Sequence, residues 1–147
     1  MNLDTVGRPM EILLIEDSLT DARLAIEALK QGDIKHRLTL VRDGAEAMAF
    51  LERRGMFARA PRPDLILLDL QLPKLDGRDV LAALRGEEDL KSIPVVILTA
   101  SKTHEDIVRS EALQVDGYLV KPLEVAEFVA LIRQLRHFWH ADVILPS

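Results

Sequence analysis

The segment PDLILLDLQLP, residues 63–73, constrains the fold of this chain more strongly than any other. Its apolar run from Leu65 to Leu68 lies between two prolines, a pattern typical of a short strand buried on both faces of a parallel sheet. The run ends on a carboxylate, Asp69. In open parallel α/β sheets the functional groups lie just beyond the carboxyl ends of the strands, so Asp69 is a candidate functional residue.

Three other strand-like runs also end in polar side chains. EILLIED ends in Glu16 and Asp17, IPVVILTAS reaches Thr99 and Ser101, and DGYLVKP reaches Lys121. If these strands lie side by side with the central one, their carboxyl ends meet at one edge of the sheet. The sequence therefore predicts that three acids, a hydroxyl group and an ammonium group converge there.

Strand-like and helix-like segments alternate along the chain. Strands are predicted at residues 11–16, 36–42, 65–69, 94–99 and 118–120, and helices at about residues 18–31, 43–55, 77–86, 103–113 and 124–137. This alternation predicts an α/β fold with a doubly wound, five-stranded parallel sheet and five helices. Ser18 or Thr20 is expected to cap the first helix, and Gly32 is expected to end it as a C′ residue.

The ends of the chain differ in character from its middle. Residues 1–10 are polar with a glycine and a proline, and we expect a flexible leader there. Residues 11–137 contain all the predicted strands and helices and are expected to form one domain. Residues 138–147 form an apolar tail beyond a domain that is already complete.

The composition excludes several classes of function. The net charge is -5, which argues against a nucleic-acid partner. The chain has no cysteine, which excludes disulfides, zinc–thiolate sites and a cysteine nucleophile. No apolar run approaches the ~20 residues that span a bilayer, and the start of the chain lacks the apolar core of a secretory signal. We therefore expect a cytoplasmic protein without a membrane partner.

The predicted acidic cluster suits a metal ion and a phosphoryl group. Like charges on Glu16, Asp17 and Asp69 raise at least one pKa unless a cation compensates them. Mg²⁺ prefers carboxylate oxygens and keeps coordination positions open for water or a phosphoryl oxygen. A carboxylate is a competent nucleophile toward phosphorus, and the Thr99 hydroxyl and the Lys121 ammonium would offset the charge of a phosphoryl group on Asp69.

These motifs together resemble those of the CheY-like receiver domains of two-component response regulators. The matching residues are ED at Glu16-Asp17, LLDLQLP around Asp69, LTAS at Thr99, and YLVKP with Lys121-Pro122. The resemblance covers about residues 11–137, and it implies a flavodoxin-like topology.

The resemblance also implies a role for each site residue. It implies that Asp69 accepts a phosphoryl group from a histidine kinase and that Lys121 pairs with that group. It further implies that Mg²⁺, or Mn²⁺, is held by Asp17, Asp69 and the backbone carbonyl of Gln71, with Glu16 acting through water.

The resemblance implies the remaining features of the switch as well. Thr99 would move toward the phosphate, and Tyr118 would follow inward as a coupled aromatic side chain. The Lys121-Pro122 peptide bond is expected to be cis. The protein would catalyse only its own Mg-dependent phosphorylation and slow dephosphorylation, so it is not expected to be an enzyme.

A finer resemblance concerns the loop before the central strand and the tail. MFARAPRP and HFWHADVILP are similar to segments of the phytochrome-associated, single-domain response regulators of bacteria. That similarity implies a phytochrome-type kinase as partner, with a phosphotransfer protein as a second possibility. It also implies output by protein–protein contact without an output domain. The apolar tail would join helix four, strand five and helix five in a homodimer, or else fold back on its own last helix.

Three other functions compete with the phosphorylated switch. A flavodoxin-like cofactor binder needs a phosphate cradle rich in hydroxyls and glycines after the first strand, where this chain has EDSLTDA. An aspartyl-phosphate hydrolase needs a D-x-D pattern there, which is absent. A pseudo-receiver, which binds partners without phosphate, typically lacks one of the acids, the threonine or the lysine, and here all are present.

Overall fold

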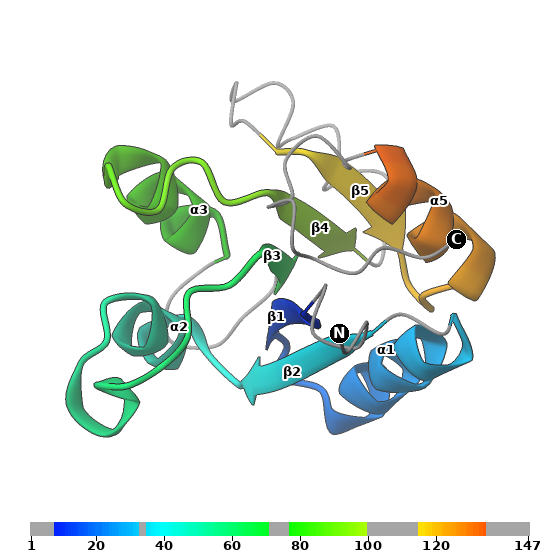
Figure 1. Cartoon of the computed structure of the whole chain (residues 1–147), viewed down its shortest axis with the longest axis horizontal. Coiled ribbons are helices and arrows are strands. Elements are labelled where there is room, and N and C mark those ends of the chain that lie inside the picture. The colour runs from blue at the N-terminus through cyan, green and yellow to red at the C-terminus, as the bar shows by residue number, and fades with distance from the viewer. Residues whose placement is uncertain (1–7, 33–34, 71–76, 100–114, 135–147) are drawn as a thin grey trace, which may run out of the picture.

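A computed structural model of the chain describes residues 8–32, 35–70, 77–99 and 115–134. It contains one five-stranded parallel sheet, which confirms the predicted α/β fold (Figure 1). The strands are β1 (Met10–Ile15), β2 (His36–Val41), β3 (Leu65–Asp69), β4 (Val95–Thr99) and β5 (Gly117–Val120). Their order in space is β2-β1-β3-β4-β5, so the acceptor candidate Asp69 ends the central strand.

Helices cover both faces of the sheet. The described helices are α1 (Leu19–Gln31), α2 (Gly44–Leu51), α3 (Gly77–Gly86) and α5 (Val125–Gln134), with a 3₁₀ turn, η2, at Gly55–Phe57. In Figure 1, α2 and α3 lie on one side of the sheet and α1 and α5 on the other. The further helix predicted at residues 103–113 lies outside the described residues.

Successive side chains of a strand point to opposite faces of the sheet, so the core has two halves, one on each face. Leu13 and Ile15 of β1 belong to the apolar cluster that includes α2 and α3. Ile12 and Leu14 belong to the cluster that includes α1 and α5. Every residue of β3 and of β4 is buried, because helices pack on both faces of these strands. Phe128 of α5 is fully buried, and burial of such a side chain contributes about 2–3 kcal/mol.

The helix ends follow local signals, with two corrections. The Ser18 hydroxyl accepts a hydrogen bond from the Asp21 N–H at 3.2 Å, which confirms Ser18 as the cap of α1. Gly32 does end α1, but as its C-cap residue with a right-handed φ of −76°, so the C′ position that we predicted for it is wrong. Helix α2 ends at Leu51, before the predicted Gly55, because Arg53 adopts a left-handed φ of 56°.

The start of the folded domain also needs correction. The leader predicted at residues 1–10 is too long, because Met10 is fully buried in β1. Both terminal nitrogens of Arg8 donate hydrogen bonds to the Asp64 carboxylate, at 2.8 and 2.9 Å, and the Glu11 N–H donates to it at 2.8 Å. This ion pair joins the chain before β1 to the start of β3. Residues 1–7 lie outside the described part of the chain.

The strand register brings the expected site residues together. Ile15 of β1 pairs with Leu68 of β3, so Glu16 and Asp69 follow at neighbouring positions. Thr99 at the end of β4 pairs with Val120 of β5, and Lys121 comes next. The carboxyl ends of β1, β3, β4 and β5 therefore lie along one edge, as the sequence predicted.

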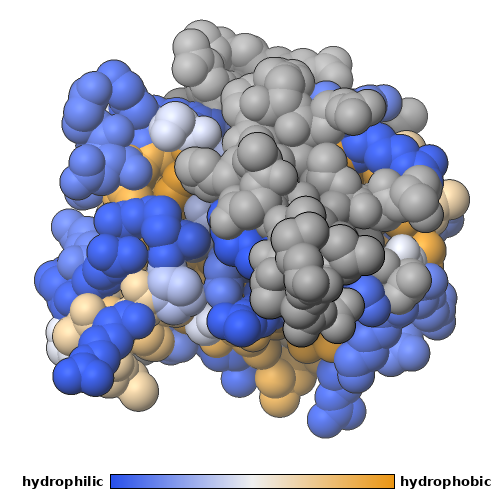
Figure 2. Space-filling view, in the orientation of Figure 1, coloured by the Kyte–Doolittle hydropathy of each residue, from blue (hydrophilic) through white to orange (hydrophobic). Residues whose placement is uncertain are grey.

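Among the coloured residues of the face in Figure 2, hydrophilic ones predominate, and hydrophobic ones show between them and along the lower edge. Within the part of the chain that the structure describes, none of the helices combines the length and the apolar character needed to cross a bilayer.

Candidate functional site

Three carboxylates meet at the carboxyl edge of the sheet. Glu16 and Asp17 follow β1, and Asp69 ends β3. One carboxylate oxygen from each lies within 4.8 Å of those of the other two. Glu16 and Asp69 are buried, and Asp17 is half-buried. The predicted acidic cluster is therefore present in the structure.

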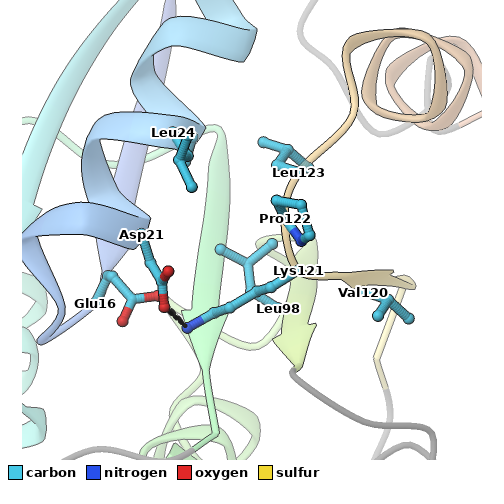
Figure 3. Close-up of a pocket in the computed structure, with 9 residues that line it drawn as sticks. Glu16, Asp21, Leu24, Leu98, Val120, Lys121, Pro122 and Leu123 are labelled. Carbon is cyan, nitrogen blue, oxygen red and sulfur yellow. Dashed lines mark hydrogen bonds and ion pairs between the residues drawn. The ribbon is translucent and has the colours of Figure 1, made fainter.

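The Lys121 ammonium lies among these acids. Its Nζ is 2.6 Å from Glu16 Oε2 and 3.2 Å from Asp69 Oδ2. A third carboxylate comes from α1, where Asp21 Oδ2 accepts a hydrogen bond from Nζ at 3.0 Å (Figure 3). Lys121 thus ties β1, β3 and the first turn of α1 to the segment after β5.

Burial and the neighbouring charges change the pKa of both Glu16 and Lys121. Burial, with the neighbouring Asp69 carboxylate, raises the pKa of Glu16 to about 7, although the interaction with Lys121 opposes the rise. Burial alone would lower the pKa of Lys121, but the contacts with Glu16 and Asp21 and the charge of Asp69 outweigh it and raise that pKa. Lys121 therefore carries a positive charge at neutral pH.

The donor set fits a hard divalent cation. The Glu16 Oε2 atom is buried and has no hydrogen bond of good geometry among the described residues, although it forms an ion pair with Lys121. A cation close to Glu16, Asp17 and Asp69 would compensate both the crowded charge and this incompletely paired oxygen. The predicted ligand Gln71 lies outside the described residues.

The other predicted site residues lie on β4, β5 and the segment that follows. Thr99 is buried at the carboxyl end of β4, beside the strand that carries Asp69. Tyr118 in β5 is half-buried and packs against the core cluster of α2 and α3. The Lys121-Pro122 peptide bond is cis, as predicted. Ser101 lies outside the described residues.

The hollow beside Lys121 is small. Its volume of about 10 Å³ has room for about one water molecule. Polar groups of Glu16, Asp21 and Lys121 line it together with six apolar residues from α1, β4, β5 and the segment after β5: Leu24, Ala25, Leu98, Val120, Pro122 and Leu123. In the described part of the chain, the site is therefore a charged sheet edge and not an enclosed pocket for an organic molecule.

Three residues near the site were not identified from the sequence. Asp21 was not predicted as a site residue, but its carboxylate accepts a hydrogen bond from Lys121. Arg42 donates hydrogen bonds from Nη2 and Nε to the backbone carbonyl of Asp17, at 2.7 and 3.2 Å. At Gly77, a Cβ atom would come within 2.6 Å of the Asp69 carbonyl oxygen. The available signal was their position, since each lies at the start of a helix or the end of a strand bordering the acidic edge.

Comparison with known proteins gives one consistent family. The family model described as the response regulator receiver domain matches residues 12–133. The response regulator Rcp1 of Synechocystis sp. is 46% identical over 144 residues, which cover 98% of this chain and 98% of Rcp1.

Solved structures agree with the sequence comparison. The bacteriophytochrome response regulator RtBRR superposes with a TM-score of 0.84 at 42% identity, covering 95% of this chain and 83% of that one. The Mn²⁺-bound form of Rcp1 superposes with a TM-score of 0.73 at 47% identity, covering 95% of this chain and all of the other. With this fold, this acidic edge and these relatives, the chain belongs to the receiver domains of two-component response regulators, a family of signalling proteins.

Proposed function

We propose that this response regulator is switched by phosphorylation of Asp69, with a histidine kinase as the phosphoryl donor. The observation that carries this assignment is the position of the Lys121 ammonium, 3.2 Å from Asp69 Oδ2 and beside two further acids. An ammonium at that distance can offset the negative charge that a phosphoryl group brings. Neighbouring acids without such a cation would repel the group.

The transfer requires a nucleophile and compensating charge. An Asp69 oxygen forms a bond to phosphorus while the bond from phosphorus to the kinase histidine nitrogen breaks, and the product is an acyl phosphate. Lys121 and the Thr99 hydroxyl pair with the phosphoryl oxygens. Mg²⁺ or Mn²⁺, held by Asp17, Asp69 and the Gln71 carbonyl with Glu16 acting through water, would neutralise charge on the phosphoryl oxygens. The same residues support self-phosphorylation by small donors and slow self-dephosphorylation.

Thr99 and Tyr118 are proposed to pass the signal along the sheet. Thr99 lies on β4, between the acceptor strand and β5, which carries Tyr118. Movement of Thr99 toward a phosphoryl group would free space that the half-buried Tyr118 ring can enter. The face formed by β5 and α5 would then differ between the two states.

The proposed kinase is of the phytochrome type. Support comes from the relatives, because two similar solved structures are described as bacteriophytochrome response regulators. Three exposed apolar side chains border the site: Leu19 and Leu24 on α1, and Val120 on β5. They offer a surface that a kinase or a phosphotransfer protein would contact. A kinase of this type would place the protein in the cytoplasm.

A homodimer is proposed as the output form. β5 is an edge strand, and α5 lies beside it on the α1 side of the sheet (Figure 1). This face, with the helix predicted at residues 103–113 and the apolar tail at residues 138–147, would form the contact between copies. Both of those segments lie outside the described residues.

Labelling with acetyl phosphate and Mg²⁺ tests the acceptor assignment. Asp69→Asn should abolish labelling of the protein, because an amide cannot form the acyl phosphate. Asp79→Asn is the matched control, since Asp79 is an exposed acid on α3, and it should label like the wild type. Undiminished labelling of Asp69→Asn would refute the assignment.

The metal ligands need a separate measurement. Asp17→Asn should lower the affinity of the protein for Mn²⁺ by about tenfold or more. Electron paramagnetic resonance of the free ion measures this affinity. Equal affinity in the variant and the wild type would remove Asp17 from the ligand set. Signalling that persists in Asp69→Asn would support the second candidate, an interaction module that works without phosphate.

A further inference from the structure

Asp21 forms a contact that its place in the sequence does not require. It lies in the first turn of α1, where its N–H donates to the Ser18 cap. Its carboxylate reaches across to the segment after β5 and accepts a hydrogen bond from Lys121 Nζ at 3.0 Å (Figure 3). The contact joins residues 100 positions apart in the chain. Helix α1 therefore supplies an anion to the side chain that would bind the phosphoryl group.

The three carboxylates around Lys121 differ in how easily they can release it. Glu16 has a 1% exposed side chain and the shortest distance to Nζ, 2.6 Å. The Asp69 side chain is 8% exposed and would itself carry the phosphoryl group. The Asp21 side chain is 36% exposed, so water can replace the ammonium at its oxygens. Asp21 is the partner whose release costs least.

An incoming phosphoryl group needs the same ammonium. Nζ donates hydrogen bonds to Asp21 and Asp69 and forms an ion pair with Glu16. A phosphoryl oxygen therefore competes with three carboxylates for the donors and the charge of Lys121. Because Asp21 is the most exposed of the three, its contact is the one that the phosphoryl oxygen would replace.

We propose that Asp21 is a positioning residue that competes with the phosphoryl group for Lys121 and thereby slows phosphorylation of Asp69. Glu16 keeps the ammonium in the site when Asp21 is absent, because its contact is shorter and more buried. Loss of the Asp21 carboxylate also removes a negative charge that repels an anionic phosphoryl donor. This inference rests on the proposed assignment of Asp69 as the phosphoacceptor.

The test is the rate of labelling by acetyl phosphate in the presence of saturating Mg²⁺. At low donor concentration, Asp21→Asn should label about two- to fivefold faster than the wild type, the range expected for loss of one partly exposed ion pair. Asp21→Glu restores the charge and should return the rate close to that of the wild type. The increase should shrink in about 1 M salt, where charges are screened.

Matched variants separate competition from other effects. Glu27→Gln removes the same charge from an exposed position on α1 and should label at the wild-type rate. Asp21→Ser repeats the removal with a different side chain, so the test does not depend on the folding of one variant. A small phosphodonor needs no docking surface, so changes in kinase recognition cannot produce the result.

The possible outcomes are distinct. Slower labelling of Asp21→Asn and Asp21→Ser would overturn the proposal, because Asp21 would then hold Lys121 in its productive position. Unchanged rates in both variants would overturn it too. Labelling that persists in Asp69→Asn would instead refute the acceptor assignment, whatever the rates of the Asp21 variants.

Discussion

Glu16 links the charge of the site to the stability of the fold. Burial raises its pKa to about 7 in the folded protein, from 4.5 for an ordinary glutamate. The folded state therefore binds a proton more tightly than the unfolded state does. The stabilisation is complete below about pH 4.5 and is lost as the pH rises through about 7, and it amounts to about 3 kcal/mol over that window.

Glu16→Gln should remove this pH dependence, because glutamine resembles the protonated acid at every pH. We expect the free energy of unfolding of the wild type, relative to Glu16→Gln, to fall between pH 5 and pH 8. Urea unfolding in a metal chelator measures it. The same measurement in saturating Mg²⁺ is the informative comparison. A bound cation should reduce the difference in the free energy of unfolding between the wild type and Glu16→Gln at pH 8. Parallel stability curves for the two proteins in chelator would contradict the prediction.

At the scale of secondary structure, α1 is the element that connects the site to the core. Ala22, Ala25 and Leu29 are buried against the sheet, while the first turn of the same helix carries Asp21. The Ser18 hydroxyl caps that turn through the N–H of Asp21 at 3.2 Å. The start of the helix and the position of the Asp21 carboxylate therefore depend on one local interaction.

Ser18→Ala should lower the free energy of unfolding by about 1 kcal/mol, because the Asp21 N–H loses its capping acceptor. Thermal or urea unfolding measures the loss. Ser18→Thr keeps a hydroxyl at the cap and should remain within a few tenths of a kcal/mol of the wild type. A Ser18→Ala variant as stable as Ser18→Thr would show that the cap does not contribute.

At the scale of the whole molecule, the proposed homodimer depends on the tail. Deletion of residues 138–147 should convert a dimer into a monomer, because the sequence of the tail is rich in apolar residues that a contact between copies would bury. Sedimentation velocity of the two proteins measures the change. Deletion of residues 1–7 is the control and should leave the dimer intact. A monomer with and without the tail would end the proposal, and a dimer in both would remove the tail from the contact.

The sequence alone determined the sheet and the main site residues. The apolar runs of β1, β3 and β4 are too continuous to be half-exposed, and each one ends on, or is followed at once by, a residue of the candidate site: Glu16, Asp69 and Thr99. Parallel strands bring such ends to one edge whatever the details of packing. For that reason Asp69 and Lys121 could be paired from the sequence although 52 positions separate them.

Only the tertiary structure decided which side chains support those residues. The rotation of α1 on the sheet aims Asp21 at Lys121, and the close approach of α3 to β3 requires a glycine at position 77. Arg42 binds the Asp17 carbonyl because β2 lies next to β1. A hydrophobic period shows which face of an element is buried, but the direction of one polar side chain depends on neighbours that only packing brings together.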